Sequence, residues 1–187
     1  MQSSQILNTN PIVQRSIGIA TLHNPAVTAI ARDPAATAQA AIVIAVAALA
    51  NAIGGAADSF REFVFAFGIG FASWFIFAAL AFSLSMRLFG TPTTHATPES
   101  LIRTLGFARG PAVLGIVGFI PLVGALVAGI GNIWMLVACV FVVRYTLGLT
   151  VVRSLLTVVV ASVLATLIGM LLAVIFGIDP GFGAIFL

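Results

Sequence analysis

Charged residues are scarce in this chain. Its 187 residues include eight arginines, five acidic residues and no lysine. Charged residues make up only 7% of the chain and hydrophobic ones 61%, with a mean hydropathy of +1.21. A soluble globular domain has roughly 25% charged and 45–50% apolar residues. The composition therefore excludes a soluble enzyme and a nucleic-acid-binding protein, and it predicts an integral membrane protein.

The residues that usually hold cofactors and metals are also few. Both histidines, His23 and His95, fall outside the long apolar runs, whereas a haem or chlorophyll at bilayer depth needs an imidazole inside a helix bundle. One cysteine, Cys139, and two distant histidines do not form a zinc site. We expect no catalytic residue, metal or cofactor, and we interpret Cys139 as a small buried apolar residue.

The acidic residues lie at the ends of apolar runs or between them. Proton- and ion-coupled carriers usually have an ionisable side chain inside a span. The chain therefore lacks the usual mark of a coupled carrier, and a carrier of an uncharged solute stays open.

Long apolar runs are abundant. A helix needs about 20 mostly apolar residues to cross the hydrocarbon core of a bilayer. Residues 35–57, 63–86 and 155–178 meet this requirement directly. The first run starts late and is longer than the apolar part of a signal peptide, so we expect no cleavage. The fold class predicted is all-α, a polytopic bundle of transmembrane helices.

The middle of the chain is harder to divide. Residues 110–143 carry no charge over 34 positions, which is long for one span and short for two. Pro111 and Pro121 each remove a backbone donor and disfavour helix in the residue before them. We predict a short third helix over 98–119, kinked at Gly110, and a fourth helix after Pro121. Whether the third helix crosses fully or is half re-entrant stays open.

Capping residues support these boundaries. Asp33 and Thr97 each precede a proline, which pairs an N-cap acceptor with the favoured first helical residue. Thr150 is expected to cap the last helix, and Gly148 to end the helix before it.

The chain divides into an N-terminal segment, residues 1–34, and a five-span membrane domain, residues 35–187. Asn10 and Asn24 each precede a proline and cut the N-terminal segment into short pieces of modest apolar content. Such pieces suit helices that lie at the membrane interface. The segment either docks to a partner or, more simply, anchors the chain before the first span.

The arginines predict five crossings, because cytoplasmic loops carry an excess of basic residues. Five crossings place seven of the eight arginines on one side and leave only Arg61 opposite. Four crossings would move Arg144 and Arg153 to the other side. We therefore expect a cytoplasmic N-terminus and an extracytoplasmic C-terminus in the cytoplasmic membrane. Arg109 and Arg144 are expected to reach the cytoplasmic headgroups, with anionic-lipid or partner binding as the functional interpretation.

Aromatic residues predict a packing surface on the second run. They recur near helical spacing on one broad face, at Phe60, Phe63, Phe67, Phe71, Trp74, Phe75 and Phe82. We interpret this stripe as lipid-facing or bundle-packing. The alternative is contact with a flat apolar partner, such as a quinone, a carotenoid pigment or another subunit.

Small residues in the middle of the chain favour close helix approach. Ala125 and Gly129 have the small-xxx-small spacing, which we interpret as packing within the bundle rather than dimerisation. Trp134, beside Asn132, is expected to pack inside the bundle as well.

Two segments resemble the core of the YIP1-domain family: residues 105–114, read LGFARGPAVL, and 118–124, read GFIPLVG. Residues 133–136 and 142–144 continue the pattern, and residues 32–40 resemble bacterial YIP1-like integral membrane proteins. The motif and packing residues are Arg109, Pro111, Gly118, Pro121, Gly124, Trp134 and Arg144.

The resemblance covers most of residues 24–170 and implies a five-span fold with a cytoplasmic N-terminus. Bacterial relatives often carry Gln-Ala-Leu-Asp after the last motif arginine, whereas this chain reads Tyr-Thr-Leu-Gly at 145–148. Eukaryotic members are linked to membrane trafficking and small GTPases through a long cytoplasmic region, and that role is not carried over.

These observations predict a non-enzymatic membrane protein that acts through helix packing. Its form would be an accessory subunit of a bioenergetic or photosynthetic complex, or a membrane-organising scaffold, with the bilayer and other membrane subunits as partners. The alternative is a channel or carrier for a small uncharged or lipidic molecule, since interrupted helices often line transporter sites. A polar cavity in the hairpin over residues 110–131 would favour the alternative. We expect that hairpin to be closed by side chains.

Overall fold

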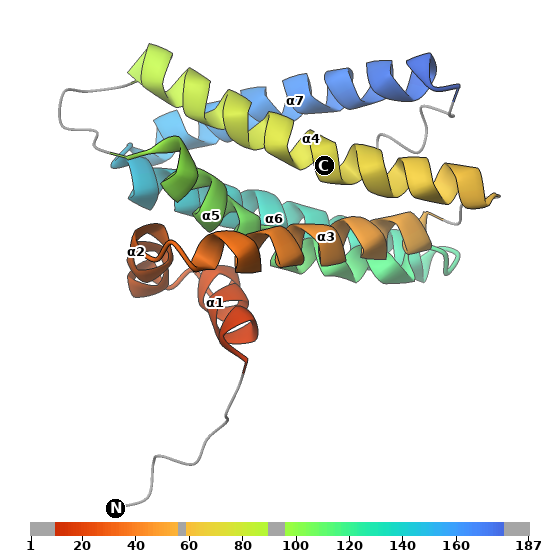
Figure 1. Ribbon diagram of the computed structural model, residues 1–187, viewed down its shortest axis with the longest axis horizontal. Coiled ribbons are helices and arrows are strands. Elements are labelled where there is room, and N and C mark those ends of the chain that lie inside the picture. The colour runs from red at the N-terminus through yellow and green to blue at the C-terminus, as the bar shows by residue number, and fades with distance from the viewer. Residues whose placement is uncertain (1–9, 56–58, 90–95, 178–187) are drawn as a thin grey trace, which may run out of the picture.

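The computed structural model describes residues 10–55, 59–89 and 96–177, and these residues form helices and no strands. Figure 1 shows long helices lying side by side, with two short helices set against one side of the bundle. This arrangement confirms the predicted all-α bundle.

Five helical segments are long and apolar enough to cross a membrane, which confirms the predicted number of spans and an integral membrane protein. They are α3 (Ala36–Gly54), α4 (Phe60–Leu84) with its π-helical extension η1 (Ser85–Phe89), α5 (Pro98–Ala108) with the 3₁₀ helix η2 (Gly110–Val117), α6 (Val123–Leu147) and α7 (Val151–Ile175). The expected loop at His95 and the expected ends of the first and fifth spans lie outside the described residues.

The third span changes helix type at the predicted kink. α5 ends at Ala108, and η2 continues from Gly110 with Pro111 in its first turn. A 3₁₀ helix rises about 2.0 Å per residue and an α-helix about 1.5 Å. The 11 residues of α5 and 8 of η2 therefore reach about 32 Å, enough for the roughly 30 Å hydrocarbon core. The third segment is thus long enough for a full crossing.

Three of the four predicted capping residues act as predicted. Asp33 does not cap the first span, because α3 begins at Ala36 with Ala35 at its N-cap. The Thr97 hydroxyl accepts a hydrogen bond from Ser100 N, 3.2 Å away, and Ser100 Oγ accepts one from Thr97 N, also at 3.2 Å. Thr150 Oγ1 accepts from Arg153 N. Gly148 ends α6 in the left-handed region, with φ of +67°. These predictions are confirmed because each depends on residues within one turn of the helix end.

The N-terminal segment forms two short helices, α1 (Pro11–Ala20) and α2 (Asn24–Arg32), which pack against the bundle. Ile19 and Ile30 are fully buried by these contacts. Figure 1 shows α2 near the end of the bundle where α3 begins, and α1 on the side of the bundle away from α7. The two helices thus share the hydrophobic core of the five spans.

The aromatic stripe of α4 does not form a single face. Trp74 and Phe77 point into the core and are almost completely buried, whereas Phe60 and Phe75 are exposed. Phe71 lies between these groups and contacts Phe75 with ring centroids 5.2 Å apart. The stripe therefore serves both the bundle and the outer surface.

The small-residue pair on α6 faces outward, so the predicted use of Ala125 and Gly129 inside the bundle is wrong. A methyl group at Gly129 would meet no atom within 4 Å, and Ala125 is exposed. Gly124 and Gly131 make the close approaches instead. Methyl groups there would lie 2.0 Å from the Val117 carbonyl oxygen and 2.7 Å from the Pro111 carbonyl oxygen.

Candidate functional site

The residues singled out in the sequence do not converge on one site. Arg109, Pro111 and Trp134 lie around the break in the third span, and Gly118, Pro121 and Gly124 lie in the turn that joins η2 to α6. Arg144 is exposed in the last turn of α6, with its guanidinium 5.1 Å from the Tyr145 ring.

Arg109 is buried in the bundle, so the expectation that it reaches the headgroups is wrong. Only 1% of its surface is exposed, and its guanidinium carbon lies 4.8 Å from the centre of the Trp74 ring. It caps the C-terminal end of α5, inside the third span. Five crossings place seven arginines on the predicted cytoplasmic side. Without Arg109, six of them remain near the span ends or in the α1–α2 segment.

A cation within a span is costly unless it contacts protein groups. The Trp74 ring provides such a contact, because the electron-rich face of an indole attracts a guanidinium.

Cys139 is fully buried in the same core, as expected.

Asn51 links α3 to η2, a contact that sequence reasoning missed. Its Nδ2 donates to the Ala112 carbonyl oxygen at 3.1 Å and to the Ala47 carbonyl oxygen at 2.8 Å. Its Oδ1 lies against Gly115, where a methyl group would come within 2.2 Å of that oxygen. The available signal was an amide side chain within an alanine-rich run.

The hairpin formed by η2 and α6 is closed, as predicted, but close backbone approach at glycines closes it rather than side chains alone. Gly124 and Gly131 bring the two backbones together. A cleft of about 350 Å³ lies beside the hairpin, between η2, Trp134 and α1, and its lining is Ser16, Ile17, Ala20, Gly110, Pro111, Val113, Leu114 and Trp134. Among the residues that the structure describes, no charged side chain lines this cleft.

Trp134 lies at the edge of the bundle, and the expectation that it packs inside is wrong. It is 44% exposed, and its Nε1 donates to the Ala20 carbonyl oxygen at 2.8 Å. Ala20 is the last residue of α1. Trp134 therefore fixes the end of α1 to α6.

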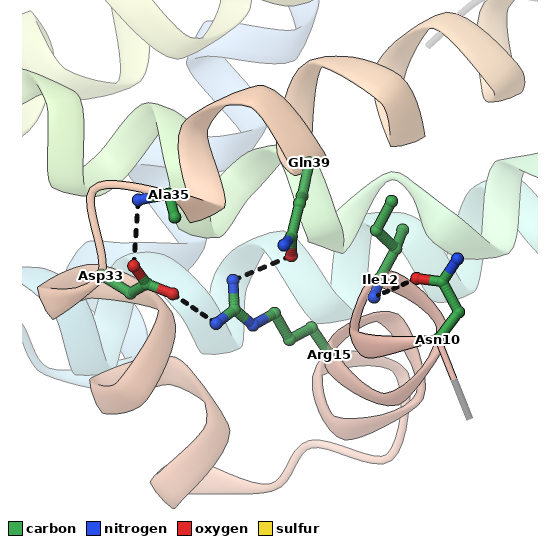
Figure 2. A network of polar contacts seen from close by, with 6 residues as sticks. All are labelled: Asn10, Ile12, Arg15, Asp33, Ala35 and Gln39. Atoms are coloured by element: carbon green, nitrogen blue, oxygen red, sulfur yellow. Dashed lines mark hydrogen bonds and ion pairs between the residues drawn. The ribbon is translucent and has the colours of Figure 1, made fainter. Parts of the chain in front are cut away.

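A polar network holds the α1–α2 segment to the first span (Figure 2). Arg15 forms an ion pair with Asp33, and its Nη1 donates to Gln39 Oε1 at 2.8 Å. Asp33 Oδ1 also accepts from Ala35 N at 2.9 Å. The hydrogen bond from Arg15 and the one from Ala35 N hold the pKa of the Asp33 carboxyl below its usual value.

An apolar groove, the α6–α7 groove, lies between these two helices. It has a volume of about 450 Å³ and is lined by Ile133, Leu136, Val137, Val140, Leu155, Val158, Val159, Ser162 and Val163. Ser162 Oγ is buried and has no hydrogen-bond partner within the part of the chain that the structure describes. The groove therefore combines an aliphatic surface with one hydroxyl group.

The chain matches no protein-family model, no curated protein and no solved structure.

Proposed function

We propose that this is a non-enzymatic membrane protein that acts through helix packing, as an accessory subunit of a larger membrane complex or as a membrane-organising scaffold. The α6–α7 groove is the observation that carries the proposal. Its occupant would be an apolar transmembrane helix of another subunit. Bioenergetic and photosynthetic complexes are the setting that we favour.

Shape supports a helix as the occupant of the groove. Lipid tails are as apolar as valine or leucine, so helices associate in a bilayer by van der Waals packing and hydrogen bonds. Six of the nine lining residues are β-branched, and such side chains have few rotamers to lose on contact. The groove is therefore a rigid surface that a partner helix contacts at little entropic cost.

Ser162 supports a protein partner over a purely apolar one. Its hydroxyl is buried in the groove wall without a partner among the described residues. Hydrogen bonds between helices in a bilayer contribute about 0.6 to 2 kcal/mol. Because this oxygen is covered, a χ1 rotation of Ser162 would have to bring it to the groove surface, where a carbonyl or hydroxyl oxygen of a partner helix would satisfy it.

Site-specific photo-crosslinking in native membranes tests the proposal. A photoreactive residue replaces Val159 in the groove or, as a control, Val64 on α4, because these valines are 49% and 47% exposed. We expect a protein adduct of one defined mass from position 159 only. The same adducts from both positions, or lipid adducts alone, would contradict the proposal.

A second arm tests whether filling the groove releases the partner. Val159→Trp is expected to remove the crosslinked partner from the protein purified in mild detergent, and Val64→Trp is expected to retain it. Retention in both variants, with normal folding of both, would place the partner elsewhere.

The topology belongs to the same proposal. We infer a cytoplasmic N-terminus and an extracytoplasmic C-terminus in the cytoplasmic membrane, and a YIP1-like relationship, from the arginines at one end of the spans and the motif residues. Reporter fusions at Gly148 and at the C-terminus test the orientation, and opposite sides are expected.

A carrier of a small uncharged or lipidic molecule is the second candidate. Arg109 favours it, since a cation within a span often marks a transport pathway. The closed η2–α6 hairpin opposes it. Solute flux in reconstituted vesicles, lost in Arg109→Gln, would support a carrier, and protein-dependent flux is expected to be absent.

A contact with a pigment or a quinone is also part of the proposal, because the rings of Phe60 and Phe75 are exposed on α4. An absorbance or extracted-quinone signal that copurifies with the protein and is lost in Phe75→Ala would locate such a molecule on α4.

A further inference from the structure

A polar cavity lies where α2, the first turns of α5 and the end of α6 meet. Its volume is about 480 Å³, and its lining is Ala31, Arg32, Ala96, Thr97, Ser100, Arg103 and Thr146. Two arginines and three hydroxyl-bearing residues thus line one cavity, and no acidic residue is among its lining residues in the described part of the chain. This composition differs sharply from that of the α6–α7 groove.

The two arginines come from separate elements. Arg32 is the last residue of α2 and is exposed, whereas Arg103 lies in the second turn of α5 and is half-buried. The Nε of Arg103 is buried and has no hydrogen-bond partner in the described residues. Two cations that share a cavity repel each other, and a bound anion would remove that repulsion.

Nearby carboxylates do not neutralise the cavity. Arg103 acts electrostatically on both Asp33 and Glu99. Asp33 is already paired with Arg15, so three arginines face two acids and one positive charge remains. The N-terminus of the 11-residue helix α5 adds a partial positive charge from its backbone N–H groups.

We propose that this cavity binds a phosphate group, with Arg32 and Arg103 as its cationic ligands. A guanidinium presents paired N–H donors that match phosphate oxygens. The residues that line the cavity come from the end of α2, the start of α5 and the end of α6. Figure 1 shows the starts of α5 and α7 at one end of the bundle, the level expected for lipid headgroups. The phosphate would belong either to an anionic lipid or to a soluble phosphate ester, and both present the same oxyanion. This site is independent of the α6–α7 groove.

Thermal unfolding of the full chain in neutral detergent tests the site. The probes are short-chain phosphatidic acid, the zwitterionic phosphatidylcholine of the same chain length, and inorganic phosphate, each titrated at constant ionic strength. We expect the unfolding midpoint to rise with phosphatidic acid and much less with phosphatidylcholine. A comparable rise with inorganic phosphate would also support the site and would assign a soluble ligand.

Variants at the cavity separate this site from general surface charge. Arg103→Gln and Arg32→Gln are each expected to weaken apparent affinity about tenfold, which corresponds to about 1.4 kcal/mol. Arg153→Gln, an exposed arginine at the same end of the bundle, is expected to leave it unchanged. Glu99→Gln is expected to strengthen binding about threefold, because a nearby negative charge is removed.

Two results would overturn the proposal. One is unchanged affinity in the Arg32→Gln variant, whose exposed position makes misfolding no explanation. The other is an equal loss in Arg153→Gln, which would show that phosphatidic acid responds only to surface charge. Arg103→Lys keeps the positive charge but loses the paired N–H donors of the guanidinium. We expect its affinity for phosphatidic acid to lie between those of the unsubstituted protein and Arg103→Gln, and its unfolding midpoint without ligand to be unchanged.

Discussion

The most direct test of the helix packing compares substitutions at Gly129 and Gly131, two glycines that lie two residues apart in α6. A methyl group at Gly131 would lie 2.7 Å from the Pro111 carbonyl oxygen and 3.0 Å from Leu114 Cβ, whereas one at Gly129 would meet nothing within 4 Å. Both positions are in the interior of the same helix. Gly131→Ala and Gly129→Ala therefore differ in what the new methyl group contacts and little in helix propensity.

The magnitudes follow from two opposing effects. Alanine stabilises a helix interior by about 0.8 to 1 kcal/mol relative to glycine. At Gly131 the new carbon would sit about 0.6 Å inside the usual carbon–oxygen contact of roughly 3.3 Å, and overpacking of this kind costs about 1 to 3 kcal/mol. We expect Gly129→Ala to raise the free energy of unfolding by just under 1 kcal/mol. The free energy of unfolding of Gly131→Ala should be about 1 to 3 kcal/mol lower than that of Gly129→Ala.

Unfolding in mixed micelles, followed by tryptophan fluorescence as the fraction of SDS rises, measures both free energies. The chain has two tryptophans, of which Trp74 lies in the core and Trp134 contacts α1. Equal stabilisation by both substitutions would refute the close approach of α6 to η2, and with it the closed hairpin.

Three further predictions concern the ends of helices. The pKa of Asp33 is lowered mainly by its hydrogen bond from Arg15, so this pair stabilises the fold above the unfolded pKa of about 3.9. That stability is lost as the pH falls through the lower folded pKa; Asp33→Asn should remove this acid dependence of unfolding. Trp134→Phe removes the hydrogen bond to Ala20 and should cost about 0.5 to 1.5 kcal/mol, seen as faster hydrogen exchange in α1. Thr97→Ala removes an N-cap and should lower the free energy of unfolding by about 1 kcal/mol, with no change in Thr97→Ser.

Sequence reasoning succeeded where the determinants are local. Apolar runs predict spans because each helix must meet the bilayer with its own residues. Thr97, Thr150 and Gly148 act within one turn of a helix end, so their roles follow from the neighbouring sequence. The break at Gly110 was predictable for the same reason, since Pro111 lacks the donor that would continue the α-helix.

It failed where the determinant is a distant contact. Trp134 donates to Ala20, which is 114 residues away in sequence, and Asn51 donates to Ala112, 61 residues away. The α6–α7 groove was not foreseen either, since hydropathy gives the same value for a side chain that faces lipid and one that faces another helix. For Arg109 the error concerned its depth in the membrane. We expected charged residues to lie outside the apolar runs, so Arg109, which precedes the charge-free run, was placed at the membrane surface.

The buried polar residues also bear on the choice between packing and transport. Ending α5 at Ala108 places a helix C-terminus within the third span, where backbone carbonyls carry partial negative charge and a cation is favourable. Arg109 is the C-cap residue of α5 and its guanidinium lies on the Trp74 ring, so helix polarity and this ring contact account for a cation within a span without a transported substrate.

The break is also fixed by three neighbouring helices. Asn51 of α3 holds the Ala112 carbonyl, Trp74 of α4 lies over the Arg109 guanidinium, and Gly131 of α6 packs on Pro111. A carrier that used the broken helix would have to separate these contacts in each cycle. Three attachments at one break favour the fixed scaffold that we propose over a carrier, and the outward faces of α6 and α7 would then form its contact with a partner.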